Sequence, residues 1–149
     1  MINTHDYIRL TNTISRKYYF NYRDFENVMK EFLNNISDLK VNITGFQFYS
    51  INMFATINEN VGMEFFISVK ENYVDVPKDM NFHSYFSIEN MIFTTVFNNY
   101  EKNTEEEYSR FKKFMEENKL EQTTPFFNVI SGDDTLQYAF LKVMVSSTK

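Results

Sequence analysis

The sequence predicts an α+β domain made of two βαββ halves. In each half of the chain, one long segment places apolar residues at helical spacing, and two segments rich in aromatic and β-branched residues follow it. The predicted order is therefore strand, helix, strand, strand, and then the same order again. At 149 residues, the chain has the length of one ordinary domain with a full core. We expect a single domain over 1–149, with a first half at about 14–70, a linker at 71–85 and a second half at about 86–146.

The first half is predicted from its amphipathic helix. Its elements are a strand at 14–20, a helix at 22–39, and strands at 44–57 and 62–70. Six apolar residues of the helix fall on one stripe: Phe25, Val28, Met29, Phe32, Leu33 and Ile36. Asn21 is a better cap than Asp24, because it precedes the whole stripe. The polar residues 58–60 predict a turn, so the last two strands form a hairpin. Residues 1–12 are predicted to be a loose lead-in.

The same order returns after a linker that contains Pro77 and several charges. The elements of the second half are a strand at 86–99, a helix at 103–120, and strands at 124–131 and 135–147. The apolar face of this helix carries Tyr108, Phe111, Phe114 and Met115. Thr104 followed by Glu107 matches a capping box, and residues 132–134 predict the turn of a second hairpin.

Side chains alternate between the two faces of a strand, and the strand that closes each half has one purely apolar face. In GMEFFISVK (62–70) we expect this face, with Met63, Phe65, Ile67 and Val69, to pack on the helices. The mixed faces hold Glu64, Phe66, Ser68 and Lys70 in the first half, and Tyr138, Phe140, Lys142 and Met144 in the second. Tyr49 is added from the neighbouring strand. The predicted ligand-binding residues are Glu64, Phe66, Tyr49, Tyr138, Phe140 and Lys142.

Composition excludes several classes of function. A formal net charge of −5 argues against a nucleic-acid partner, and no window approaches the roughly 20 apolar residues of a membrane span. The absence of cysteine excludes disulfides and zinc–thiolate sites and fits a cytoplasmic protein. His5 and His83 show no metal-ligand motif, and no nucleotide-binding glycine loop is present, so we expect no metal and no cofactor. The heavy use of Asn, Lys, Phe, Tyr and Ile indicates an AT-rich bacterial genome.

The element order, the strand GMEFFISV and the PFF that follows the second helix resemble the GyrI-like family, the effector-binding domain of multidrug-responsive transcription regulators. The resemblance covers about 14–146. It implies a curved antiparallel sheet with two helices on one side and a small-molecule groove on the other. Glu64 and the pair Ile67 and Val69 stand where relatives carry an acid and an Ile or Val pair. A second acid is missing, and no Tyr follows Pro125 in the way of the PxxxY-like stretch of relatives. No helix-turn-helix precedes the domain, which implies a stand-alone protein.

These features predict a non-enzymatic binding protein for a hydrophobic or cationic small molecule. Aromatic rings supply apolar area and cation–π attraction, and Glu64 supplies charge complementarity. The structural alternative is that Glu64 pairs with Lys142 or Lys70 on a solvated face, where such pairs are worth about 0–1 kcal/mol. A hydrolase that uses Glu64 with Tyr49 or Tyr138 is a smaller alternative, since some GyrI-like proteins hydrolyse reactive small molecules.

The second class of function is a non-enzymatic interaction protein. The same groove would then bind a protein partner through its Phe and Tyr side chains, as in an accessory, chaperone-like, inhibitor or immunity subunit of a secretion or toxin locus. We expect a monomer or a homodimer, in which an edge strand at 86–97 pairs across the dimer axis.

Overall fold

The computed structural model describes residues 2–53, 60–97, 100–132 and 137–147. The fold is α+β, as predicted, and its strands pair antiparallel. The chain forms two compact units: a first unit, Arg9–Ser87, and a second unit, Met1–Ile8 together with Ile88–Lys149. Two long strands, β1 (Asn3–Asn21) and β4 (Met80–Phe97), run through both units.

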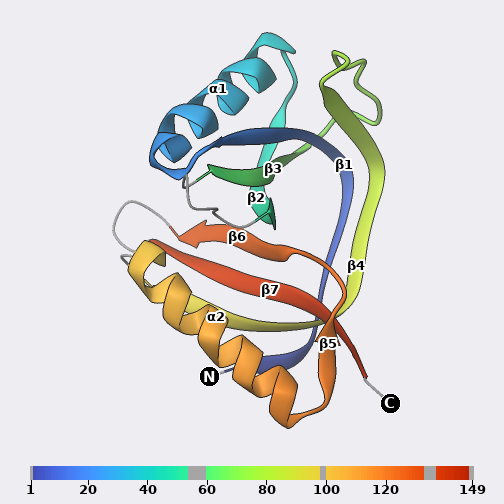
Figure 1. Cartoon of the computed structure of the whole chain (residues 1–149). Helices are drawn as coiled ribbons and strands as arrows, with labels where there is room; N and C mark the ends of the chain where they lie inside the picture. The colour runs from blue at the N-terminus through green and yellow to red at the C-terminus, as the bar shows by residue number, and fades with distance from the viewer. Residues whose placement is uncertain (1, 54–59, 98–99, 133–136, 148–149) are drawn as a thin grey trace. The chain divides into compact units, whose positions relative to one another are not determined.

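In the first unit, β3 lies between β1 and β2 and pairs antiparallel with both (Figure 1). Besides β1 and the start of β4, this unit contains η1 (Tyr22–Asp24), α1 (Phe25–Asp38), β2 (Ile43–Met53) and β3 (Asn60–Val69). The side chain of Asn21 accepts a hydrogen bond from the backbone N–H of Arg23 at 3.0 Å, which confirms Asn21 as the cap of the helical segment.

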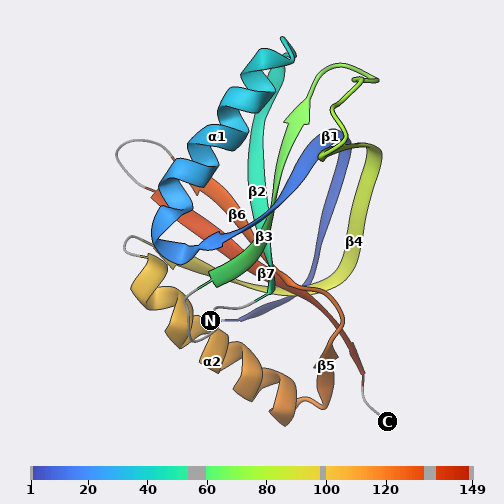
Figure 2. The same cartoon turned by 45° about the horizontal axis from the view of Figure 1, so that its top comes forward.

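The core of the first unit lies between α1 and one face of this sheet (Figure 2). Phe65 of β3 is fully buried at its centre. Its ring lies 5.5 to 6.4 Å, between centroids, from the rings of Tyr18, Phe20, Phe25, Phe32 and Tyr49. The prediction that the Phe65 face of β3 packs on a helix is therefore confirmed.

In the second unit, β7 lies between β4 and β6, and β5 pairs with the end of β7. The elements are α2 (Tyr100–Glu117), β5 (Leu120–Gln122), β6 (Phe126–Gly132) and β7 (Gln137–Ser147). The helix α2 runs along β7 (Figure 1) and packs Phe111 and Met115 in one core with Leu141 and Val143. The side chain of Thr104 in the predicted capping box lies outside the described part of the chain, as do the turn residues 58–59 and 133–134.

Two segments that were predicted to be irregular are strand. The predicted lead-in, residues 1–12, belongs to β1 from Asn3 onward, and the last part of the predicted linker belongs to β4, which begins at Met80. A sheet ladder pairs backbone groups whatever the side chains, so polar segments also become strands when a neighbouring strand is available. Ile8 and Met80, both buried, anchor these extensions. Within the described residues, no helix is both long and apolar enough to cross a membrane.

Candidate functional site

Glu64 lies on β3, on the sheet face of the first unit that points away from α1. Its strand neighbours on this face are Lys17 of β1 and Ser50 of β2. The hydroxyl of Ser15 donates a hydrogen bond to Oε2 of Glu64 at 2.8 Å. Glu64 is half-buried, and among the described residues the structure gives it no ion pair. The carboxylate thus accepts from a neutral donor, and none of the described ion pairs includes it, although Lys17 is its opposed neighbour on β1.

Ser15 connects Glu64 to His83. Oγ of Ser15 is fully buried and lies 2.9 Å from Nε2 of His83, which is on β4. A carboxylate can only accept hydrogen bonds, so Ser15 donates its hydroxyl hydrogen to Glu64. In the second hydrogen bond Oγ of Ser15 is then the acceptor, and Nε2–H of His83 is the donor. The three side chains therefore form one directed chain of hydrogen bonds, from imidazole to hydroxyl to carboxylate.

An aromatic group lies beside this chain of hydrogen bonds; we call it the Phe66 cluster, and it consists of Phe48, Phe66, His83 and Phe86. Phe48 and Phe66 are strand partners whose rings stack almost parallel, with an angle of 2° and centroids 4.5 Å apart. Both are buried. Phe86 lies tilted against both, at 5.6 Å from Phe48 and 5.1 Å from Phe66, and the His83 ring lies 5.7 Å from Phe86. Glu64 thus stands next to a packed group of rings.

The prediction that Tyr49 shares this face is corrected by the register of β2. Tyr49 is directly opposite Phe65, and Phe48 is directly opposite Phe66. Opposed residues of antiparallel strands point to the same side, so Tyr49 belongs to the face that α1 covers. Its buried ring packs edge-on against Phe25 of α1 at 5.3 Å. Phe48, which the sequence reasoning passed over, takes the place that was predicted for Tyr49.

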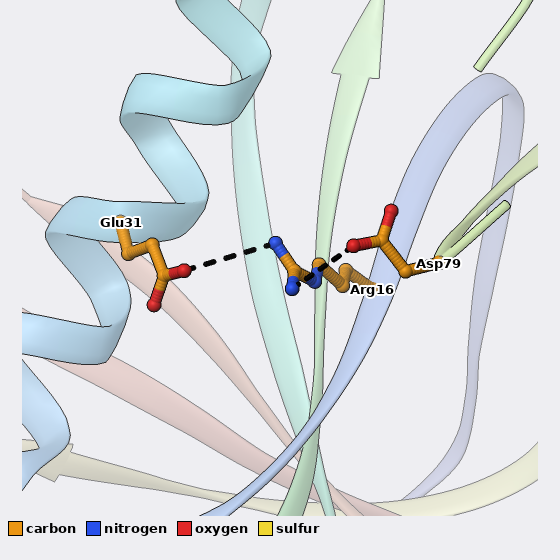
Figure 3. A network of polar contacts seen from close by, with 3 residues as sticks. All are labelled: Arg16, Glu31 and Asp79. Atoms are coloured by element: carbon orange, nitrogen blue, oxygen red, sulfur yellow. Dashed lines mark ion pairs between the residues drawn. The ribbon is translucent and has the colours of Figure 1, made fainter. Parts of the chain in front are cut away.

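The α1 side of this sheet carries a separate charge network (Figure 3). Arg16 of β1 lies between Glu31 of α1 and Asp79, which precedes β4. Its Nη2 is 3.0 Å from Oδ2 of Asp79, and its Nη1 is 3.9 Å from Oε1 of Glu31. The guanidinium also covers the ring of Tyr18 at 4.6 Å. Burial raises the pKa of Tyr18, and the positive charge of Arg16 opposes part of this rise. This network ties α1 and the segment before β4 to the sheet.

In the second unit, Lys142 of β7 has its own acidic partner. Its Nζ is 2.7 Å from Oδ2 of Asp6, and both side chains are largely buried. The same ammonium lies 5.7 Å from the ring centroids of Phe93 and Phe140. The structure therefore gives Lys142 the carboxylate of Asp6; a pair with Glu64 was one of the two options in the structural alternative.

The remaining predicted residues of β7 share one face, as strand alternation predicted. The ring of Tyr138 contacts that of Phe140 edge-on at 5.5 Å, and Phe140 contacts Phe93 at 6.0 Å. The six predicted residues thus fall into three sets: Phe66 in the Phe66 cluster with Glu64 beside it, Tyr49 under α1, and Tyr138, Phe140 and Lys142 in the second unit.

The sequence reasoning missed Ser15, His83, Phe48 and Phe86. Ser15 lies in the predicted strand at 14–20, where it shares its parity with Lys17 and Tyr19, so the sequence did not mark it as buried. His83 and Phe86 lie in or next to the predicted linker and carried no signal. Within the described ranges, no group of three or more His, Asp or Glu residues is placed to hold a metal ion.

The antiparallel pairing of the strands and the two helices give the fold that the GyrI-like resemblance implied. The chain belongs to the family described as a domain of unknown function (DUF5085), which it matches over residues 9–147. A comparison with curated proteins finds no match.

Several solved structures share this fold at low sequence identity. The C-terminal domain of EcmrR matches with a TM-score of 0.68 and 9% identity, over 99% of each chain. EcmrR in its complex with DNA matches with a TM-score of 0.70 and 9% identity, over 99% of this chain but 58% of that one. A hydrolase from Listeria innocua matches with a TM-score of 0.56 and 10% identity, over 95% of this chain and 91% of that one. At these identities, the likeness concerns the fold alone.

Proposed function

We propose that this protein binds a small hydrophobic cation at Glu64 and the Phe66 cluster, and that it does so without catalysing a reaction. The observation that carries the proposal is the half-buried carboxylate of Glu64, which has a hydroxyl donor and no described ion-pair partner, next to packed aromatic rings. The GyrI-like resemblance points to the same class of ligand. The cysteine-free composition fits action in the cytoplasm.

The physical reason is that a half-buried carboxylate gains from a positive charge. Burial weakens the interaction of Glu64 with water, and the hydrogen bond from Ser15 replaces only part of this solvation. A cation brought next to it interacts through a lower effective dielectric constant than in water. Aromatic surface beside the acid adds apolar contact and cation–π attraction. A ligand with one positive charge and one or more rings satisfies both parts of the site.

The same geometry argues against a nucleophilic role for Ser15 and against a catalytic pair of Glu64 with Tyr49. Ser15 is fully buried, so its hydroxyl is not accessible for attack on a substrate. A Glu64–Tyr49 pair is excluded because the two side chains lie on opposite faces of the sheet.

The test is titration calorimetry with benzyltrimethylammonium and with neopentylbenzene, its uncharged analogue of the same shape. We expect the cation to bind wild type more tightly than the neutral compound, and we expect Glu64→Gln to weaken cation binding by roughly tenfold while it leaves the neutral compound unaffected. Glu116→Gln, on the exposed side of α2, removes the same charge far from the site in sequence and is the matched control. If wild type and Glu64→Gln bind the cation equally, Glu64 is not the anionic site.

A further inference from the structure

We propose that Phe86 occupies the ring-binding position of this site, so that a ligand's aromatic ring binds by taking the place of the Phe86 side chain. This inference rests on the proposed function and adds a specificity-determining residue and a ligand class to it, namely a cation that carries a single aromatic ring close to its charge.

The Phe66 cluster is already a filled aromatic site. Phe48 and Phe66 form its floor, since their nearly parallel rings come from directly opposed positions of two paired strands. Phe86 contacts both rings at similar distances and similar tilts, 49° to Phe48 and 51° to Phe66. Offset or tilted packing of this kind is the arrangement that aromatic rings prefer. Phe86 is therefore bound to the floor in the way that a ligand ring would be.

The residues of the cluster differ in their burial. Phe48 and Phe66 have exposed fractions of 0% and 2%, so in this structure their rings offer no surface to a ligand. Phe86 is only half-buried, and it comes from β4, whereas the floor comes from β2 and β3. Moving one side chain of β4 would uncover the floor without disturbing the β2–β3 ladder. A ligand ring that does this replaces the contacts of Phe86 with Phe48 and Phe66.

The position of Glu64 limits the size of the ligand. Glu64 and Phe66 are two residues apart on the same face of β3. Ser15 connects the Glu64 carboxylate to His83 through hydrogen bonds of 2.8 and 2.9 Å, and His83 is itself a member of the cluster. The acid is therefore a same-face neighbour of Phe66 and is joined to His83 through Ser15, so we infer that a ligand with its ring in the Phe86 position carries its charge close to that ring.

The experiment compares Phe86→Ala and Phe86→Leu with Phe82→Ala. Phe82 is also a half-buried phenylalanine of β4, but its ring contacts Tyr73 and lies outside the cluster, which makes it the matched control. Benzyltrimethylammonium and toluene are titrated into each variant by calorimetry, after circular dichroism has shown that the variant is folded. We expect Phe86→Ala to bind both probes at least about tenfold more tightly than wild type, because the truncated side chain leaves an apolar cavity that accepts an aromatic ring. Phe86→Leu should gain less, and Phe82→Ala should bind as wild type does.

The outcomes separate this inference from the proposed function. If the folded Phe86 variants bind the probes no more tightly than Phe82→Ala does, Phe86 does not fill the ring position, and the inference is overturned whether or not wild type binds cations. If Phe86→Ala gains affinity for toluene but shows no preference for the cation, the ring position is supported and the role of Glu64 in the proposed function is refuted. Should Phe86→Ala not fold, Phe86→Leu decides the matter by the same comparison.

Discussion

Replacing Ser15 with alanine tests whether the hydrogen bonds around Glu64 hold the site together. The substitution removes the donor to Glu64 and the acceptor for His83 at a fully buried position. A hydrogen bond to a charged group contributes about 1.5–3 kcal/mol, but Glu64 is half-exposed and water can replace part of the loss. We therefore expect Ser15→Ala to lower the free energy of unfolding by about 2 kcal/mol.

The matched control is Ser50→Ala on the same face of the sheet. Ser50 is also buried and donates a hydrogen bond, at 2.5 Å, but its acceptor is the neutral amide of Asn52. A neutral hydrogen bond is worth about 1 kcal/mol, so Ser50→Ala should cost about half as much as Ser15→Ala. Urea unfolding followed by circular dichroism gives both values, with the slope m as a check that the unfolded states are comparable.

A double-mutant cycle then isolates the contact itself. Ser15→Ala and Glu64→Ala, measured singly and together, should show a coupling energy of about 1 kcal/mol, since each residue loses its partner in the other's variant. Two results would refute the reasoning: equal costs for Ser15→Ala and Ser50→Ala, or a coupling energy within the roughly 0.5 kcal/mol found for independent sites.

Two further predictions concern the charges of the first unit. Hydrogen bonds from the backbone and side-chain N–H groups of Asn42 hold the pKa of Glu71 below its ordinary value. These bonds therefore stabilise the folded state at pH values above the ordinary Glu pKa, and this stabilisation is lost as the pH falls through the lowered pKa of Glu71. The difference in urea midpoint between wild type and Glu71→Gln should therefore shrink below about pH 4, and a constant difference would contradict this. Arg16→Met should lower the free energy of unfolding by about 1 kcal/mol in low salt and by less in 1 M salt, because its partners Glu31 and Asp79 are 57% and 56% exposed. If the loss of stability does not depend on salt, Arg16 stabilises the fold by packing on the sheet and not by its charge.

The helix-packed faces of the sheet could be predicted because their signal is local. Alternation within β3 is enough to separate Phe65 from Glu64 and Phe66, and the structure keeps this separation. The place of Tyr49 could not be predicted in the same way, because it depends on the register between β2 and β3. A shift of one residue moves every side chain of a strand to the other face, and the sequence of β2 is aromatic on both faces, so it does not select the register by itself.

The partners of Glu64 were beyond the reach of sequence reasoning for a different reason. His83 lies in a segment whose Pro77 and charges predict a linker, and the segment becomes strand because β1 is there to pair with it. Ser15 lies 49 residues from Glu64 along the chain, and His83 lies 68 residues from Ser15. Such contacts are set by the pairing of distant strands, which no local pattern records.

The division of β1 between the two units also determines the order in which the chain can fold during synthesis. The first unit is one continuous segment and is complete once Ser87 has emerged. The second unit needs residues from both ends of the chain: the backbone carbonyl of Tyr7 accepts a hydrogen bond from Lys142, 135 residues later. Closing so long a loop is entropically costly and slow. The first residues of β1 are therefore among the last to reach their final places.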